Sequence, residues 1–212
     1  FTLGVGVTHK VVSEAWFGVP YRDAVRLCAE ELEALQGLLS PARSADLDGS
    51  LVRTHVKVAL GVEPPGLVVA ALGPKMLALA GRFADGTVTW MTGRRTLAER
   101  VVPQLRAAAA DAGRPDPRVV VGLPVCVTDD VDDARRRLLP AMAGAAQMPS
   151  YRRMLEWEGV EQPTDIALVG DEHAVREQIE QLGAAGATEL MANVVGTESE
   201  RRRTRELLAA LG

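Results

Sequence analysis

The chain has 212 residues, of which 47% are apolar and 25% are charged, and its mean hydropathy is +0.05. This composition is typical of a soluble globular domain, and a net charge of −4 leaves no basic excess with which to neutralise nucleic-acid phosphates. No run approaches the roughly 20 apolar residues that a membrane helix needs, so we expect neither a nucleic-acid nor a membrane partner. Two isolated cysteines, Cys28 and Cys126, are typical of buried free thiols in a reducing cytoplasm.

The first quarter of the chain mixes extended and helical patterns. Residues 2–7 predict a strand, and residues 11–20, with two large aromatic side chains, predict a loop. Apolar spacing then predicts a helix at 21–39, followed by a polar turn at 40–50. The alternating polarity of residues 53–60 suits a half-exposed strand or hairpin outside the main sheet.

Residues 66–90 hold the most informative pattern of the chain, a strand, a Gly-Pro turn, a helix and a second strand. The apolar run at 67–71 suits a strand buried on both faces, as in a parallel sheet. Pro74 is suited to the first position of a helix, which Asp85 and Gly86 close before the next strand. Such a turn leaves backbone N–H groups free at a helix N-terminus, where an anion can bind.

Strands and helices continue to alternate up to the end of the chain. This alternation predicts a parallel α/β architecture, and the chain shows no repeat or long linker, so we expect a single domain over residues 1–212. The remaining predicted elements are strands at 118–127 and 188–195 and helices at 97–112, 129–147, 151–158, 171–182 and 198–211.

Three segments of the chain resemble one known family. They are Phe1-Thr2-Leu3-Gly4-Val5-Gly6, the run Ala70-Ala71-Leu72-Gly73-Pro74-Lys75-Met76 with Ala80-Gly81 and Ala84-Asp85-Gly86 after it, and Gly183-Ala184-Ala185-Gly186-Ala187-Thr188-Glu189-Leu190. In this order and spacing they are similar to the luciferase-like monooxygenase superfamily, in particular to its branch of oxidoreductases that use the deazaflavin coenzyme F420. The resemblance covers essentially the whole chain.

The resemblance implies a (β/α)₈ barrel, the TIM-barrel fold. Such a barrel typically takes about 250 residues, and the sequence predicts barrel strands at 2–7, 67–72, 86–91, 118–127 and 188–195, which are five of eight. The first of these resembles the family's fourth strand, so we expect the first three β/α units of the barrel to be missing from this sequence. An open sheet edge would favour association into a homo-oligomer.

Active sites of such barrels lie at the carboxyl ends of the strands. This rule selects residues 7–9, 72–74, 91–94 and 193–196. The turn at Gly73 can hold a phosphate through the N–H groups of the residues after it, and it can equally be a tight turn that packs helix on sheet. The resemblance implies that the cofactor phosphate binds there, and the predicted cofactor-binding residues are Gly6, Thr8, Ala70, Ala71, Leu72, Gly73, Pro74, Lys75, Met76 and Arg94.

His9 follows the first strand and is the predicted catalytic residue, with contact to the deazaflavin or to the substrate and a role in proton transfer. A histidine in a surface loop is the alternative. Trp16, Phe17 and Trp90 are expected to wall a substrate pocket, although the first two could also form an apolar plug over the barrel edge. The three histidines are dispersed and no carboxylate or thiol stands at ligand spacing, so no metal site is predicted.

The predicted function is hydride transfer between F420 and a small organic substrate, in which the protein orients the cofactor and supplies a proton. Two alternatives stay open. An FMN-dependent monooxygenase could use the same barrel, because reduced FMN activates oxygen whereas a deazaflavin carries hydride. A non-catalytic barrel homologue would bind neither cofactor.

Overall fold

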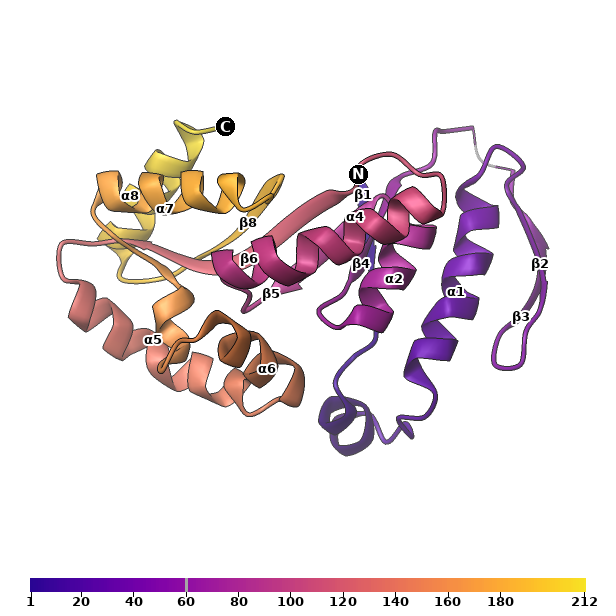
Figure 1. Ribbon diagram of the computed structural model, residues 1–212, viewed down its shortest axis with the longest axis horizontal. Coiled ribbons are helices and arrows are strands. Elements are labelled where there is room, and N and C mark those ends of the chain that lie inside the picture. Colours follow the sequence, from indigo (N-terminus) through magenta and orange to yellow (C-terminus); the bar gives the residue numbers. More distant parts are fainter. Residues whose placement is uncertain (60) are drawn as a thin grey trace. The chain divides into compact units, whose positions relative to one another are not determined.

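A parallel sheet forms the centre of the computed structural model, which describes residues 1–59 and 61–212. The hydrogen-bonded order of its strands is β1-β4-β5-β6-β7, and β8 pairs with β6 (Figure 1). The predicted parallel α/β architecture is confirmed. The strands are β1 (Thr2–Val5), β4 (Gly66–Ala70), β5 (Gly86–Trp90), β6 (Arg118–Val127), β7 (Leu168–Gly170) and β8 (Glu189–Val194).

Helices follow nearly every strand. They are η1 (Val12–Trp16), α1 (Ala24–Leu39), α2 (Pro74–Phe83), α3 (Arg94–Thr96), η2 (Leu97–Val101), α4 (Val102–Asp111), α5 (Val131–Ala146), α6 (Pro149–Glu158), η3 (Pro163–Ile166), α7 (Glu172–Ala184) and α8 (Glu198–Ala209). Within the described residues, no helix combines the length and the apolarity needed to cross a membrane. Contacts divide the chain into two compact units, residues 1–88 with 104–117 and residues 89–103 with 118–212, so the single domain stays a prediction.

The first unit is organised around β4, whose central residues are almost completely buried. Leu67, Val68 and Val69 expose 4%, 6% and 0% of their surface, because β1 and β5 pair with the strand and α2 covers it. Gly81 allows α2 and α4 to approach closely, since a Cβ there would stand 2.8 Å from the carbonyl oxygen of Leu105. The apolar run that predicted a buried strand is therefore explained by burial on both sides.

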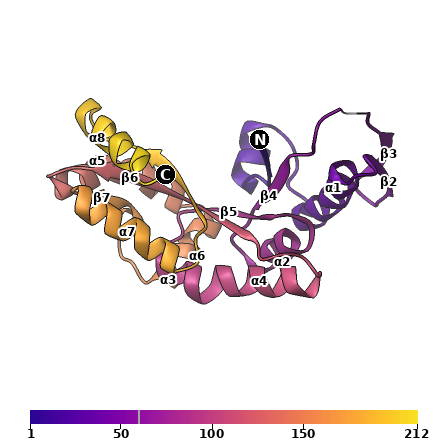
Figure 2. The same cartoon turned by 90° about the horizontal axis from the view of Figure 1, so that it is seen from above.

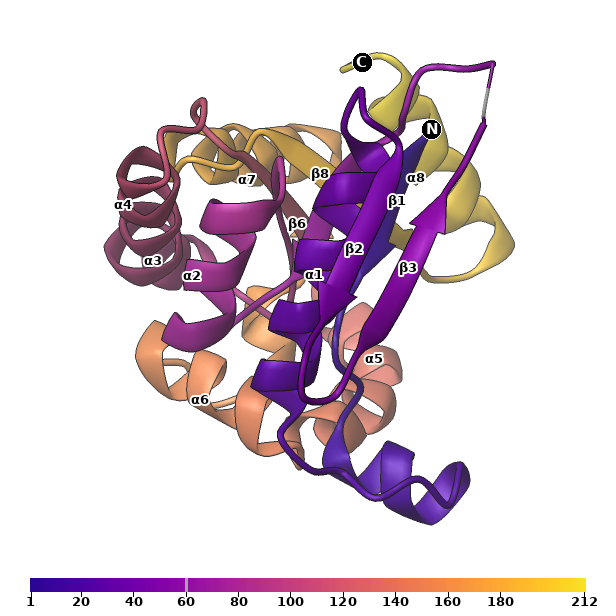
Figure 3. The same ribbon diagram turned by 90° about the vertical axis from the view of Figure 1, so that its right-hand side faces the viewer.

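A hairpin of β2 (Ser44–Asp48) and β3 (Arg53–Lys57) lies outside this sheet and packs on α1 (Figure 3). Its turn is held by Glu30 of α1. One carboxylate oxygen accepts hydrogen bonds from the backbone N–H and the hydroxyl of Ser50, at 3.1 and 2.7 Å, and the other accepts from the N–H groups of Leu51 and Val52, at 2.7 and 2.8 Å. A single carboxylate thus satisfies three backbone donors of the turn.

The second unit is organised around β6, the longest strand. Its alternate residues Val119, Val121, Leu123, Val125 and Val127 are all at most 1% exposed. β8 pairs with residues 120–125 of this strand and β7 with residues 125–127, while α7 and α8 run beside it (Figure 2). The hydroxyl of Thr204 ties α8 to the sheet, because it accepts a hydrogen bond from the N–H of Val127 at 2.8 Å.

Three sequence predictions are corrected by the structure. The predicted polar turn at 40–50 is wrong over residues 44–48, because β2 is defined by its pairing with β3 and buries only Ala45 fully. The predicted loop at 11–20 contains a single π-helical turn, η1. β7 was not predicted, since its three residues are too few to show a pattern. Residue 60, the last of the predicted strand 53–60, lies outside the described residues.

We predict that Glu30→Gln lowers the melting temperature by a few degrees at neutral pH, because an amide cannot replace a carboxylate that accepts four hydrogen bonds. These bonds hold the pKa of Glu30 at about 2, below its usual 4.5. A lowered folded pKa stabilises the protein above the unfolded pKa, and the contribution disappears as the pH falls from about 4.5 towards 2. Thermal melts of both proteins across this range measure the effect.

Glu33→Gln, at an exposed position of the same helix, is the matched control. It should melt like the wild type at every pH. A constant difference between Glu30→Gln and wild type from pH 7 down to pH 2 would contradict the role given to the ionised carboxylate.

Candidate functional site

The carboxyl ends of β1 and β4 meet in the first unit. Val5 is the register partner of Val69, which places Gly6 beside Ala70 at the next position. A Cβ on Gly6 would stand only 2.6 Å from the Cβ of Ala70. Gly6 is therefore required by the close approach of the two strand ends, and the structure brings it together with the first of the residues predicted from β4.

The turn between β4 and α2 is open above the helix N-terminus. Gly73 is the N-cap residue, its backbone is extended at φ −94° and ψ 160°, and no side chain caps the helix from this position. Its carbonyl oxygen accepts the hydrogen bond of Leu77 at 2.9 Å, so the N–H groups of Lys75 and Met76 precede the first helical donor. A Cβ on Gly73 would meet no atom within 4 Å. Neither strain nor packing requires glycine here, and the space at its Cβ position is open.

Four other α-helices that follow strands of the sheet, α3, α5, α7 and α8, have a side-chain acceptor at their start. The carboxylate of Glu158 accepts from the N–H groups of Arg95 and Thr96 at 3.1 and 2.8 Å, at the start of α3. Asp130 caps α5 and Asp171 caps α7. Within the part of the chain that the structure describes, α2 and α1 are the helices following a strand that no side chain caps, and of these two only α2 begins directly at the carboxyl end of a strand.

The cap of α8 determines whether a phosphate could also bind at the start of that helix. In barrels the commonest phosphate site follows strands 7 and 8, which correspond here to β6 and β8. Thr197 and Glu200 form a reciprocal cap at the start of α8, in which the Glu200 carboxylate accepts from the N–H of Thr197 at 2.6 Å. At the start of α5, the carboxylate of Asp130 accepts from the N–H of Asp133. A phosphate at either position would meet a carboxylate, whereas Gly73 offers none.

His9 lies just beyond β1 and is half-buried. Burial lowers the pKa of its imidazole below the usual 6.5. The ring is therefore neutral at pH 7, and it can accept a proton on one nitrogen and donate from the other. Its backbone carbonyl accepts the N–H of Ser13 at 2.9 Å and thereby starts the turn that leads into η1.

The predicted pocket aromatics do not come together in one unit. Trp16 and Phe17 belong to the first unit and are 75% and 69% exposed. Trp90 belongs to the second unit, where its ring lies over Gly122 next to Met191. Their assignment to a substrate pocket stays a prediction.

The remaining predicted residues are placed as follows. Ala71 is buried below the turn and Leu72 is half-buried, while Pro74 is exposed at the first position of α2. Thr8 is exposed beyond β1. Arg94 lies in the second unit, where it donates a hydrogen bond to the side chain of Gln181.

Two features lie near the end of β5: Met91, which falls in the segment 91–94 selected from the sequence but was given no role, and Gly122, which was not selected. Met91 is 1% exposed and has a positive φ of 55°, an uncommon conformation for a buried residue with a long side chain. Gly122 is the second feature, since a Cβ there would stand 2.7 Å from the ring of Trp90 and from the methyl group of Met191. A glycine within a β-branched strand is a signal of such close packing and could have identified this position.

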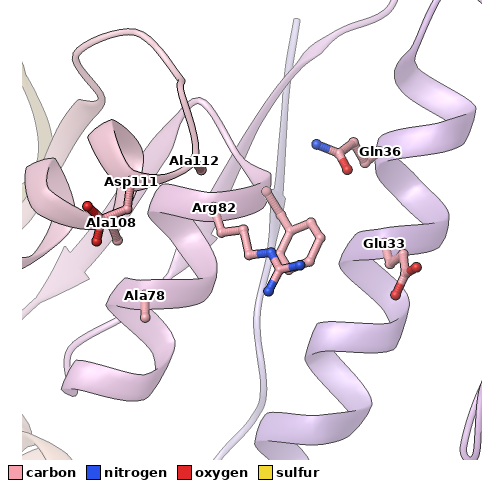
Figure 4. A pocket seen from close by; sticks show the side chains of 8 residues that line it. Glu33, Gln36, Ala78, Arg82, Ala108, Asp111 and Ala112 are labelled. Carbon is pink, nitrogen blue, oxygen red and sulfur yellow. The ribbon is translucent and has the colours of Figure 1, made fainter.

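A cavity of the first unit lies away from these strand ends. It has a volume of about 650 Å³ and is lined by residues of α1, α2 and α4, with Arg82 of α2 opposite Glu33 of α1 (Figure 4). The lining residues of α2 are Ala78, Arg82 and Phe83, none of which lies in its first turn. Because α2 begins at the carboxyl end of β4, this cavity is at the opposite edge of the sheet and does not contact Gly73. The described residues contain no cluster of three metal-ligating side chains.

The chain is similar in sequence to proteins of a known family. Residues 1–189 match the family described as luciferase-like monooxygenase. A 5,10-methylenetetrahydromethanopterin reductase from Methanolobus tindarius is 28% identical over 136 residues, which is 64% of this chain and 41% of that protein. The chain therefore matches less than half the length of this curated relative.

Two solved structures show the same fold. The coenzyme F420-dependent tetrahydromethanopterin reductase from Methanopyrus kandleri superposes with a TM-score of 0.77, at 20% identity over 98% of this chain and 72% of that one. The oxygenating constituent of 3,6-diketocamphane monooxygenase from Pseudomonas putida, in complex with FMN, gives 0.69 at 20% identity over 98% and 68%. The predicted luciferase-like α/β barrel, with about five of its strands in this chain, is confirmed.

We predict that Gly6→Ala destabilises the protein by about 1–3 kcal/mol, because its Cβ would collide with that of Ala70. Gly6→Ala combined with Ala70→Gly should recover most of this loss, since the second change removes the colliding atom. Chemical denaturation of the three proteins measures both effects. Gly144→Ala, in α5 where a Cβ meets nothing within 4 Å, is the control and should not be destabilising. An unaltered stability of Gly6→Ala would contradict the close approach of the strand ends.

Proposed function

The chain belongs to the luciferase-like monooxygenase family, and on that premise we propose that it is an oxidoreductase that transfers a hydride between coenzyme F420 and a small organic substrate. The observation that carries this proposal is the uncapped N-terminus of α2 at Gly73. It lies at the carboxyl end of a parallel strand, where ligands of such sheets bind. The cofactor phosphate would accept hydrogen bonds from the N–H groups of Lys75 and Met76.

The residues at this turn fit a phosphate group. The N–H groups of a helix N-terminus and the helix dipole both favour an anion, and the open space at Gly73 leaves room for one. Lys75 is exposed next to these donors and adds a positive charge. When bound, F420 would supply the hydride carrier; the protein fixes the position of its phosphate and with it the orientation of the ring.

His9 is the proposed proton-handling residue of the site. Its lowered pKa keeps the imidazole neutral at pH 7, so the ring holds one N–H with which to donate a hydrogen bond to a substrate oxygen. Its place directly after β1, whose end lies against the end of β4, supports this role. The substrate class is left as a small organic molecule.

F420 is favoured over FMN by a resemblance in the sequence. The run Ala70–Met76 and its flanking segments resemble the F420-dependent branch of the family. A phosphate cradle made of backbone N–H groups suits FMN as well, since both cofactors carry a phosphate. An FMN-dependent monooxygenase is therefore the second candidate.

We predict opposite effects of Gly73→Asp on stability and on cofactor affinity. An aspartate at the N-cap accepts hydrogen bonds from the first N–H groups of α2, so the melting temperature should stay equal or rise. The same carboxylate repels the phosphate and competes for its donors, which costs about 1.5–3 kcal/mol of binding, or roughly tenfold to more than a hundredfold in affinity. Fluorescence titration of the protein with F420 and with FMN measures this change.

Gly73→Ala is the matched control, because its methyl group enters open space and neither caps the helix nor carries charge. Its F420 affinity should stay close to that of the wild type. Wild-type affinity in Gly73→Asp would contradict the phosphate site. Tight binding of FMN with no binding of F420 would favour the monooxygenase, and binding of neither would favour a non-catalytic homologue.

We predict that His9→Ala lowers turnover by roughly 10²–10⁴, the usual contribution of a positioned acid or base. Because burial lowers the pKa of His9, the limb of the pH–rate profile that depends on it should lie below pH 6.5 and should be missing in the variant. His173→Ala, at an exposed position of α7, is the control for loss of a histidine. Equal turnover and an unchanged profile would make His9 a bystander.

A further inference from the structure

A cavity of about 260 Å³ in the second unit has an unusual polar lining. It lies among α3, α5, α7 and the segment that leads into β7. Six polar side chains line it: Arg94, Arg135, Glu158, Asp165, Gln178 and Gln181. It is large enough for a small molecule together with some water, because one water takes about 30 Å³ of liquid volume.

Most acceptors in this lining are already engaged. Glu158 gives one oxygen to the N–H of Arg95 and the other to the N–H of Thr96. The amide of Gln178 both accepts from the N–H of Val169 and donates to its carbonyl oxygen, each at 3.2 Å. These side chains form hydrogen bonds to α3 and to β7. Their oxygen atoms therefore have few lone pairs left to accept a hydrogen bond from a molecule in the cavity.

The donors, in contrast, are in excess. The Nε of Arg135 is buried and has no hydrogen-bond partner within the described part of the chain, and the guanidinium stands 3.8 Å from Asp165, which is beyond hydrogen-bond distance. Arg94 donates to the neutral amide of Gln181. The Arg135 side chain as a whole is 41% exposed, but a donor atom that is buried without an acceptor costs free energy, so such atoms normally have a partner.

We propose that this cavity binds a small oxyanion, a phosphate or a carboxylate, between Arg94 and Arg135. Two guanidinium groups provide several N–H donors in planar forks, and these match the paired oxygens of phosphates and carboxylates. The bound anion would supply the acceptor that Arg135 Nε lacks. This site is separate from the Gly73 turn and does not depend on the proposed function.

Calorimetric titration of the purified protein tests this site. Inorganic phosphate and acetate are titrated separately, with chloride at matched ionic strength as the reference, so that the two kinds of oxyanion are distinguished. We expect binding of at least one of them to the wild type and at least tenfold weaker binding to Arg135→Gln and to Arg94→Gln. Arg136→Gln, on the same helix but exposed and paired with Asp133, should bind like the wild type.

The Gly73→Asp variant separates this site from the proposed cofactor site. Loss of phosphate binding in Gly73→Asp, with full binding in Arg135→Gln, would assign the anion to the α2 N-terminus and overturn the proposal. No heat beyond that of chloride in the wild type would overturn it as well. Circular dichroism shows whether each variant is folded. If Arg135→Gln does not fold, Arg94→Gln provides the test instead, because Arg94 is at an exposed position.

Discussion

The parallel pairing of β1 with β4 is the constraint on which the candidate site depends. It places Gly6 against Ala70, and it sets the carboxyl end of β4 beside the segment that carries His9. The complete burial of Val69 stabilises this pairing, and the hydroxyl of Thr87 holds β5 on the other side of β4 by donating to the Val69 carbonyl at 2.8 Å. Asp85, directly before β5, holds the start of β4, because its carboxylate accepts the N–H of Leu67 at 2.8 Å. The end of β4 therefore leads into a turn at which no side chain caps the following helix, α2.

Capping chemistry distinguishes this turn from those that lead into α3, α5, α7 and α8. The protein places a carboxylate or hydroxyl at the start of α3, α5, α7 and α8, and each of these groups satisfies N–H donors that folding would otherwise leave open. At α2 a glycine and a proline stand at the corresponding positions. In the proposed function, an anionic ligand bound there would remove the cost of leaving these donors without a partner, and this would link helix capping to cofactor binding.

Much of the fold could be predicted from the sequence because burial leaves a periodic signal. The apolar run at 67–71, the β-branched run of β6 and the Gly-Pro turn each gave the observed element. Pairing and contacts that depend on the tertiary structure left no such signal. β2 exists through its partner β3 and through Glu30, and β7 consists of three residues.

The same distinction applies to the candidate site. Gly73 could be selected from its local sequence, whereas the lack of caps at its helix becomes evident only by comparison with the other helices. The packing of Trp90 over Gly122 and the positive φ of Met91 depend on neighbouring strands, and only the glycine had a visible signal in the sequence.

The central claim is that backbone N–H groups at the start of α2 hold the cofactor phosphate. Amide chemical shifts in ¹⁵N-labelled protein report on these groups directly. On addition of F420, the amide resonances of Lys75 and Met76 should shift strongly, and those of Thr197 and Glu200 at the capped start of α8 should not. Saturating F420 that shifts the α8 amides and leaves Lys75 and Met76 unchanged would contradict the account.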